Sequence, residues 1–166
     1  FNDERSMITI RDLLNMTSGL EFPENEHESM FFRHDQIEYS KSIGVEKEPT
    51  KLFEYNNVNS MLLGEILENA TGQKADVLLK ERIFSKIGID NYTLWRDGAG
   101  NPMTYCCIDM SARDYSKFGL LFSRKGRWED QQIISEKFIN EILSPYWNTT
   151  PNWWTEENRG YSLHWW

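Results

Sequence analysis

Helix-capping residues, followed by apolar residues at helical spacing and a glycine or proline stop, divide most of this chain into short helices. Thr9 and Asp12 form a capping-box pattern that predicts a helix over residues 10–16. Regularly spaced apolar residues predict a longer helix from Asn59 to Thr71. Further helices are predicted from Ala75 toward Gly88, from a Ser111 cap to Gly126, and from a Ser135 cap to Leu143. The chain is therefore expected to be mostly α.

Two short segments have the character of a β-strand instead. Tyr92 to Trp95 is one strand candidate, and residues 161–166 alternate large apolar side chains with smaller ones. A single two-stranded hairpin is only marginally stable in water. We therefore expect residues 160–166 to be the entry into a β-sheet that lies outside this sequence, and residues 1–166 to be one partial domain.

Composition excludes several classes of partner. The 166 residues carry 18 Lys and Arg against 26 Asp and Glu, a formal charge of −8, so a nucleic-acid backbone would be repelled. No uninterrupted apolar run is long enough for a transmembrane helix. With 39% hydrophobic and 14% aromatic residues, the chain is too apolar for a disordered segment. We expect a folded protein without a nucleic-acid partner or a membrane-spanning segment.

The sequence contains no pattern for a metal, a cofactor or a disulfide framework. The only cysteines, Cys106 and Cys107, are adjacent; a bond between them would close a strained ring, and neither has another partner in the chain. His27 and His34 lie in an acidic stretch that we interpret as a loop, without a His-Glu-x-x-His pattern. We expect no zinc site and no cofactor, and the cysteines leave the redox compartment open.

One short element carries side chains suited to catalysis. Tyr55 and Asn57 stand two residues apart in a loop that leads directly into the helix predicted from Asn59. A phenol and an amide donor in this position can face the same side of a cleft. Taken alone, the pattern favours a loop tyrosine that caps a helix.

Longer blocks of the sequence give this element a context. Residues 8–20, ITIRDLLNMTSGL, resemble a segment of the class C β-lactamase and penicillin-binding-protein family of serine hydrolases. Three later blocks are similar to family segments in the same order: residues 53–72 with the Tyr-x-Asn motif, residues 82–89, and residues 110–121. Residues 105–107 and 160–166 look most like the branch that contains 6-aminohexanoate-dimer hydrolase. This resemblance extends over nearly the whole chain.

The resemblance implies that the chain is the helical part of an α+β β-lactamase/transpeptidase-like fold. The family's nucleophile lies in a Ser-x-x-Lys motif and its third motif reads Lys-Thr-Gly or His-Thr-Gly, and this sequence contains neither. In family order they belong before Phe1 and after Trp166, so we expect the N- and C-terminal parts of the same domain to lie outside the chain. By resemblance, Tyr55 is the candidate general base, Asn57 a substrate-binding amide and Tyr105 an aromatic residue lining the substrate pocket.

The implied activity is hydrolysis of an amide, ester or β-lactam through an acyl-enzyme, with a small-molecule substrate. Because the chain carries no nucleophile beside the candidate base, we expect the isolated chain to show no turnover. The resemblance favours a periplasmic or extracellular location, and a cytoplasmic one stays open.

Two alternatives remain at this stage. One is a non-catalytic module of the same fold that binds glycan or protein through its tryptophan-rich end; the other is an independently folded helical interaction module. The tryptophans of this end are Trp128, Trp147, Trp153, Trp154, Trp165 and Trp166. Packing against the rest of the fold is the simpler role for them.

Overall fold

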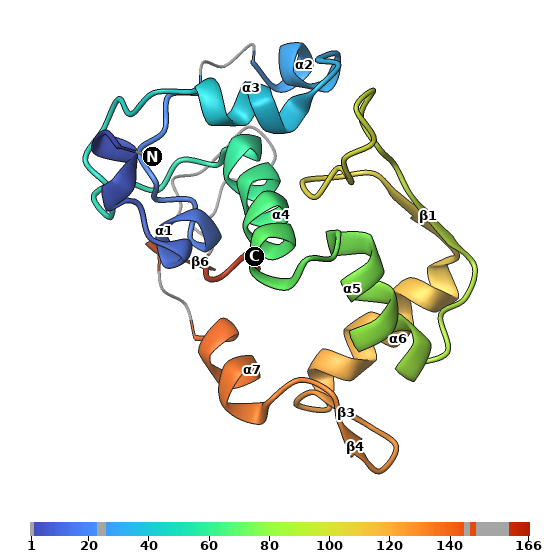
Figure 1. Cartoon of the computed structure of the whole chain (residues 1–166). Helices are drawn as coiled ribbons and strands as arrows, with labels where there is room; N and C mark the ends of the chain where they lie inside the picture. The colour runs from blue at the N-terminus through green and yellow to red at the C-terminus, as the bar shows by residue number, and fades with distance from the viewer. Residues whose placement is uncertain (1, 23–25, 145–146, 149–159) are drawn as a thin grey trace.

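The computed structural model describes residues 2–22, 26–144, 147–148 and 160–166. It is mostly helical, as predicted. The helices are α1 (Ile10–Leu14), α2 (Glu26–Phe31), α3 (Gln36–Ser42), α4 (Asn57–Thr71), α5 (Ala75–Arg82), α6 (Ala112–Ser123) and α7 (Glu136–Ile142). Two 3₁₀ turns, η1 (Glu4–Met7) and η2 (Phe84–Lys86), precede α1 and follow α5. Helix α4 occupies the middle of the molecule, between α3 on one side and α5 on the other (Figure 1).

The capping signals place most helix starts correctly. The Thr9 hydroxyl accepts from the Asp12 N–H at 3.2 Å and the Asp12 carboxylate accepts from the Thr9 N–H at 2.9 Å, which confirms the capping box. Helix α4 begins two residues earlier than predicted. Its cap is Asn56, whose side-chain oxygen accepts from the Val58 N–H at 2.8 Å.

Helices α2 and α3 were not predicted, so the interpretation of this acidic stretch as a loop was wrong. His27 lies within α2, and α3 starts shortly after His34. The Asp35 side chain accepts from the Glu38 N–H at 2.9 Å and so caps α3. Asp35 and Glu38 stand at the spacing of a capping box, and that spacing is the signal that could have revealed this helix.

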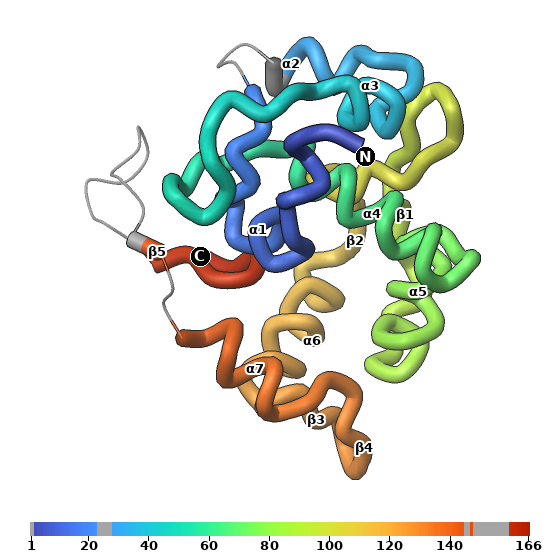
Figure 2. Tube along the Cα trace, turned by 60° about the vertical axis from the view of Figure 1, so that its left-hand side comes forward, coloured from blue at the N-terminus to red at the C-terminus, as the bar shows by residue number. Residues whose placement is uncertain are grey.

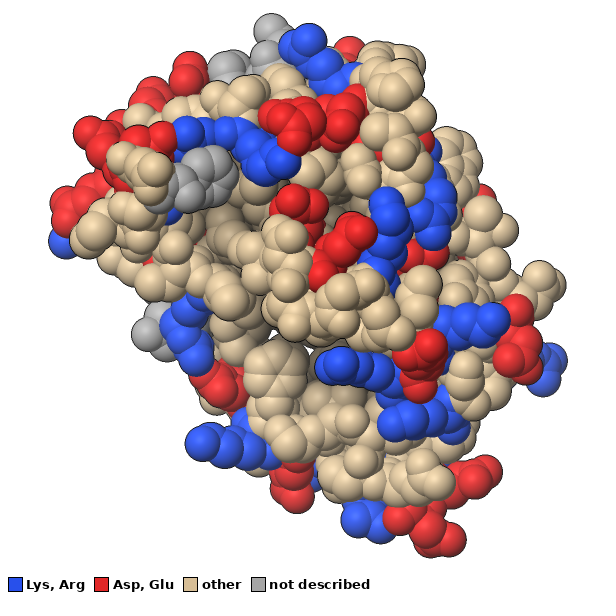
Figure 3. All heavy atoms as spheres, in the orientation of Figure 1, with Lys and Arg blue, Asp and Glu red and all other residues tan. Residues whose placement is uncertain are grey.

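Three clusters of buried side chains form the core. The cluster around α4, which we call the α4 core, consists of Leu13, Leu20, Phe22, Met30, Ile37, Val58, Met61 and Leu62. A second cluster consists of Phe84, Ile87, Ile89 and Leu121, and a third of Phe122, Ile139, Ile142 and Leu163. Acidic and basic side chains are interspersed on the face shown in Figure 3, so the net negative charge does not collect there into one patch.

Among the described residues, the strands form three short antiparallel pairs. They are β1 (Tyr92–Leu94) with β2 (Ile108–Met110), β3 (Arg127–Trp128) with β4 (Gln131–Gln132), and β5 (Trp147–Asn148) with β6 (Gly160–Tyr161). The first pair confirms the strand predicted at residues 92–95, with Tyr92 opposite Met110. The pairs are too short to build a layer of their own, and they fasten the ends of helices and loops.

The final residues depart from the predicted strand. Extended pairing ends at Tyr161, and the chain then turns at Leu163 and His164, which have φ of 46° and 71°. Ser162 and Trp165 close this turn through two backbone hydrogen bonds of 2.9 Å. The strand predicted over residues 161–166 is therefore present only at its start, because residues 162–165 form a turn that no glycine or proline marks. That residues 160–166 lead toward a larger sheet stays a prediction.

The loop after α1 depends on a glycine that has no room for a side chain. Gly19 has φ of +70°, its carbonyl accepts from the N–H groups of Glu46 and Lys47, and a Cβ would collide with the Lys47 carbonyl. We predict that Gly19→Ala lowers the free energy of unfolding by about 3 kcal/mol, combining left-handed backbone strain with overpacking. Gly72 has φ of +71° but open space around it, so Gly72→Ala isolates the backbone cost of about 1 kcal/mol. Urea unfolding of both variants measures the difference in their free energies of unfolding. An equal loss of stability in the two variants would contradict the collision at Gly19.

Candidate active site

Tyr55 lies on the loop that enters α4, and its ring leans on the C-terminal segment. It is 40% exposed. Its ring centroid lies 5.8 Å from that of Trp166 at an interplanar angle of 31°, and 6.5 Å from that of Tyr161 in an edge-to-face arrangement. Both distances are in the range of favourable aromatic pairs. One face of the phenol is therefore covered by aromatic rings while part of the side chain reaches solvent.

Phe53 completes this group, which we call the aromatic cluster: Phe53, Tyr55, Tyr161 and Trp166. The Phe53 centroid lies 5.0 Å from that of Tyr161 and 6.2 Å from that of Trp166. The backbone between the two aromatic residues of the loop is also held, because the Glu54 N–H donates to the Met16 carbonyl at 2.8 Å. The cluster thus fastens the loop before α4 to the C-terminal segment.

The C-terminal segment is itself anchored on α1. The Leu163 N–H donates to the buried Asn15 side-chain oxygen at 3.0 Å, and the His164 N–H donates to the Leu14 carbonyl at 2.9 Å. Figure 2 shows the red C-terminal segment lying against α1. These contacts bring Tyr161 to the Tyr55 loop although the two lie far apart in the sequence. Spacing along the chain carries no signal for such a contact, and sequence reasoning missed it.

Electrostatics at Tyr55 favour the neutral phenol. Burial raises the pKa of Tyr55 above its ordinary value of 10.0. Burial raises the pKa of Tyr161 as well, and the neighbouring Tyr55 adds to the rise. Partial burial lowers the pKa of His164 and favours the neutral imidazole. A base at Tyr55 therefore needs a positive charge that the described residues do not place against its ring.

Asn57 is the first residue of α4 and is half-buried. The neighbouring Asn56 fixes the entry into the helix: its amide donates to the Leu20 carbonyl at 3.2 Å while its oxygen caps Val58. Both polar atoms of the Asn56 side chain thus take part in this structural role. Tyr55 and Asn57 consequently sit at the same helix entry, on either side of the capping residue.

A buried polar network lies beneath this entry, and the sequence offered no sign of it. The Ser18 hydroxyl donates to the Asn59 side-chain oxygen at 2.6 Å, and the Asn59 amide lies 3.4 Å from the Met16 sulfur. All three residues are buried. The network ties α4 to the loop after α1 and so fixes the position from which Tyr55 projects.

Tyr105 has different neighbours from Tyr55. Its ring packs against the α4 core, and its buried hydroxyl lies beside the Gln36 side chain in a geometry too poor for a hydrogen bond. Burial raises the pKa of Tyr105 to about 12. Its contacts thus lie toward α3, whereas those of Tyr55 lie toward the C-terminal segment.

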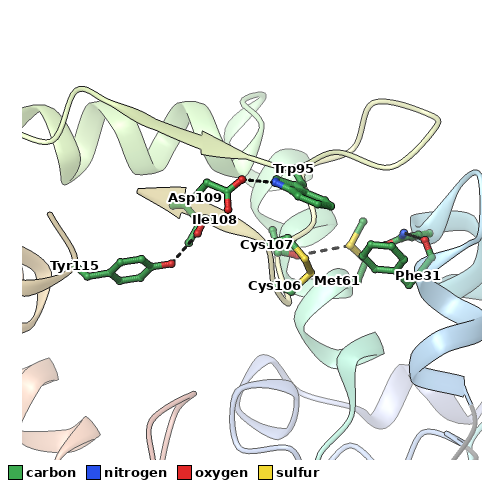
Figure 4. The surroundings of a disulfide bond; sticks show 10 residues. Phe31, Met61, Trp95, Cys106, Cys107, Ile108, Asp109 and Tyr115 are labelled. Atoms are coloured by element: carbon green, nitrogen blue, oxygen red, sulfur yellow. Dashed lines mark hydrogen bonds between the residues drawn. A yellow bond between two sulfur atoms is a disulfide. The ribbon is translucent and has the colours of Figure 1, made fainter. Parts of the chain in front are cut away.

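The structure corrects the expectation for the cysteines. Cys106 and Cys107 form a disulfide bond with each other, beside Trp95 and Met61 (Figure 4). The backbone accommodates the small ring because residues 104–106 form a turn and Cys107 adopts φ of 71°. A left-handed residue at this position could not be read from the sequence.

The next observations concern metal-binding groups, membrane-spanning helices and an apolar hollow. Among the described residues there is no group of three or more His, Cys, Asp or Glu arranged to hold a metal ion. In the same part of the chain, none of the helices has the length and apolar character needed to cross a bilayer. An apolar hollow of about 370 Å³ lies between η1, α1, α3 and α4, and its lining does not include Tyr55, Asn57 or Tyr105.

Comparison with known proteins places this arrangement in a family. The family model described as Beta-lactamase matches residues 2–166. A comparison with curated proteins found no match. Among solved structures, the chain is similar to a protein described as a 6-aminohexanoate-dimer hydrolase from Bacillus anthracis, with a TM-score of 0.75 and 21% identity over 82% of this chain and 41% of that one.

Two further structures share the fold. The octameric penicillin-binding protein homologue from Pyrococcus abyssi gives a TM-score of 0.73 with 17% identity, covering 95% of this chain and 42% of that one. D-amino acid amidase from Ochrobactrum anthropi gives 0.68 with 23% identity, covering 98% and 60%. The chain thus spans 41% to 60% of the length of these structures. Because the family model matches essentially the whole sequence, the chain belongs to the beta-lactamase family.

Proposed function

We propose that this chain is part of a serine hydrolase that cleaves amide or ester bonds through an acyl-enzyme, and that it supplies the Tyr55 and Asn57 wall of the site. The observation that carries the proposal is the position of Tyr55. It is partly exposed at the entry of α4, with one face covered by aromatic rings and Asn57 at the first turn of the helix. The family match supports the reaction class.

The proposed reaction needs a serine from a part of the protein outside this sequence, because no serine here is followed by lysine at the fourth position of Ser-x-x-Lys. Tyr55 as phenolate takes the proton of that serine while the serine oxygen bonds to the substrate carbonyl carbon. Tyr55 then returns the proton to the leaving nitrogen or oxygen as its bond to carbon breaks. Water attacks the acyl-enzyme in the same way and releases the acid.

Asn57 and Tyr105 have positioning roles in this proposal. The Asn57 amide is suited to donate to the substrate carbonyl or amide oxygen and hold it for attack. Tyr105 lines the pocket through its ring, since its hydroxyl is turned toward Gln36. The substrate is a small amide, ester or β-lactam, and the aromatic cluster favours one with an apolar part beside the reacting carbonyl.

The described tryptophans give less support to the binding-module alternative. Trp165 is partly buried against the third core cluster, with its ring centroid 4.1 Å from that of Phe122 and its ring stacked on that of Phe118. Trp128 packs against the second core cluster, which contains Phe84 of η2 and Leu121 of α6. Trp153 and Trp154, on which a glycan platform would depend, lie outside the described residues. The contacts of Trp128 and Trp165 thus support a packing role for these two tryptophans.

Removal of the Tyr55 hydroxyl tests the proposed base. We expect Tyr55→Phe in the whole protein to lower kcat for 4-nitrophenyl ester hydrolysis by roughly 10²- to 10⁴-fold, the usual contribution of a general base. Tyr115→Phe is the matched control, because Tyr115 is also exposed and its hydroxyl donates only to the Ile108 carbonyl at 2.7 Å. An unchanged kcat in Tyr55→Phe would rule out this role.

Asn57 and its neighbour allow substrate binding to be separated from folding. We expect Asn57→Ala to lower kcat/KM by about tenfold, the equivalent of one lost hydrogen bond. Asn56→Ala instead removes the helix cap, so it should lower the free energy of unfolding by about 1 kcal/mol. Steady-state kinetics and urea unfolding of both variants distinguish the two roles. Loss of stability without loss of kcat/KM in Asn57→Ala would contradict the proposal.

Titration of Tyr55 tests whether the chain alone can furnish a base. Because burial raises the pKa of Tyr55, the phenol stays protonated at neutral pH and its titration midpoint lies above the ordinary value of 10.0. The absorbance change at alkaline pH of the isolated chain, minus that of its Tyr55→Phe variant, should show this midpoint, and the isolated chain should hydrolyse no ester. A midpoint below 10 would show that the chain already holds the activating charge.

A further inference from the structure

The disulfide between Cys106 and Cys107 occupies the base of a long loop. Strand β1 ends at Leu94 and strand β2 begins at Ile108, so residues 95–107 form the loop between them. The Trp95 N–H donates to the Cys107 carbonyl at 3.0 Å, and the Cys106 N–H donates to the Met103 carbonyl at 3.3 Å. Figure 4 shows the two sulfurs close to Trp95 and to Met61 of α4. The disulfide thus lies at the end of the loop, directly before β2 begins.

The loop is seated closely on α4 just before the disulfide. The Thr104 hydroxyl donates to the Ser60 carbonyl at 2.7 Å. A Cβ on Gly64 would meet the Thr104 side chain at 2.8 Å, so the loop approaches the helix as far as a glycine allows. Tyr105 follows, with its hydroxyl buried and without a well-formed hydrogen bond to any described residue. A buried hydroxyl in this state is unfavourable, and other contacts must hold the residue there.

Cys107 supplies such a constraint. Its φ of 71° lies in the left-handed region, which residues with a Cβ avoid. Unfavourable backbone conformations persist where the surroundings over-determine them, and the ring that joins Cys106 to Cys107 does so here. Once the ring opens, Cys107 is free to return to an extended conformation. That change would move its carbonyl away from the Trp95 N–H and displace the adjoining Tyr105.

We propose that Cys106 and Cys107 form a reversible redox site that locks the loop of residues 95–107 onto α4, and that reduction by a dithiol releases this loop. Neither cysteine is fully buried, so a small dithiol can reach the bond. One thiolate of the reductant attacks a sulfur of the pair and forms a mixed disulfide, and its second thiolate displaces that sulfur. The reductant becomes a cyclic disulfide, and the protein gains two electrons and two protons as two thiols.

The proposal does not depend on the hydrolase reaction. Its readouts are thiol content and backbone protection, so its failure would leave the proposed function untouched. A Tyr55→Phe variant with unchanged kcat would overturn the proposed base and leave this proposal untouched. Where Tyr105 does line a substrate pocket, release of the loop would alter KM before kcat.

The experiment compares the whole protein before and after dithiothreitol. After refolding in a glutathione redox buffer, alkylation of the denatured protein should label neither cysteine, and after dithiothreitol it should label both. Hydrogen exchange of peptides covering residues 95–108 should become at least tenfold faster on reduction, while peptides from α6 stay unchanged. Free thiols before reduction, or unchanged exchange after it, would overturn the proposal.

Two variants assign the effect to the pair and to the Cys107 backbone. The double variant Cys106→Ser, Cys107→Ser should exchange as fast as the reduced protein and ignore dithiothreitol. Cys107→Gly also lacks the bond, but glycine adopts a positive φ readily, so its loop should remain more protected than that of the double serine variant. Equal exchange rates in the two variants would overturn the assignment of the release to the Cys107 conformation.

Discussion

The hydrogen bond from the Leu163 N–H to the Asn15 side chain is the contact on which the candidate site depends. It joins the two ends of the chain at 3.0 Å, and both residues are buried. A second backbone bond from the same turn reaches a carbonyl at the end of α1, one of the groups that a helix leaves unpaired. Tyr161 and Trp166 flank this turn, so α1 determines where the aromatic cover of Tyr55 lies. Without this docking, the phenol would project into solvent from an isolated loop.

Local chemistry explains why most helices could be predicted. Thr9, Ser111 and Ser135 each cap the helix that the sequence assigned to them, because a cap is a contact between residues three apart. The spacing of Asp35 and Glu38 marks the start of α3 in the same way, but it stands in a highly charged stretch of a kind typical of loops. The start of α4 was less predictable, because its cap, Asn56, is the middle residue of the Tyr-x-Asn motif, which was interpreted as a loop.

The candidate site was predictable only in part. A short motif identified Tyr55 and Asn57, and the structure places both at one helix entry. The neighbours of Tyr55 come from the far end of the chain, and no spacing encodes them. Their arrival depends on a turn whose left-handed residues, Leu163 and His164, carry ordinary side chains. Long-range docking and positive φ at residues other than glycine are the two features that sequence patterns do not report.

Burial and basicity oppose one another at Tyr55 in the proposed hydrolase. The aromatic rings that cover the phenol remove water from it and raise its pKa, which makes the chain alone a poor base at neutral pH. The same removal of water lowers the local dielectric constant and strengthens the attraction between a phenolate and any ammonium brought beside it. The aromatic wall therefore weakens the base in the absence of a cation and amplifies the effect of a cation once it is present. In the proposed hydrolase, basicity at Tyr55 would then depend on a cation supplied from outside this chain, with the chain contributing the phenol and its apolar surroundings.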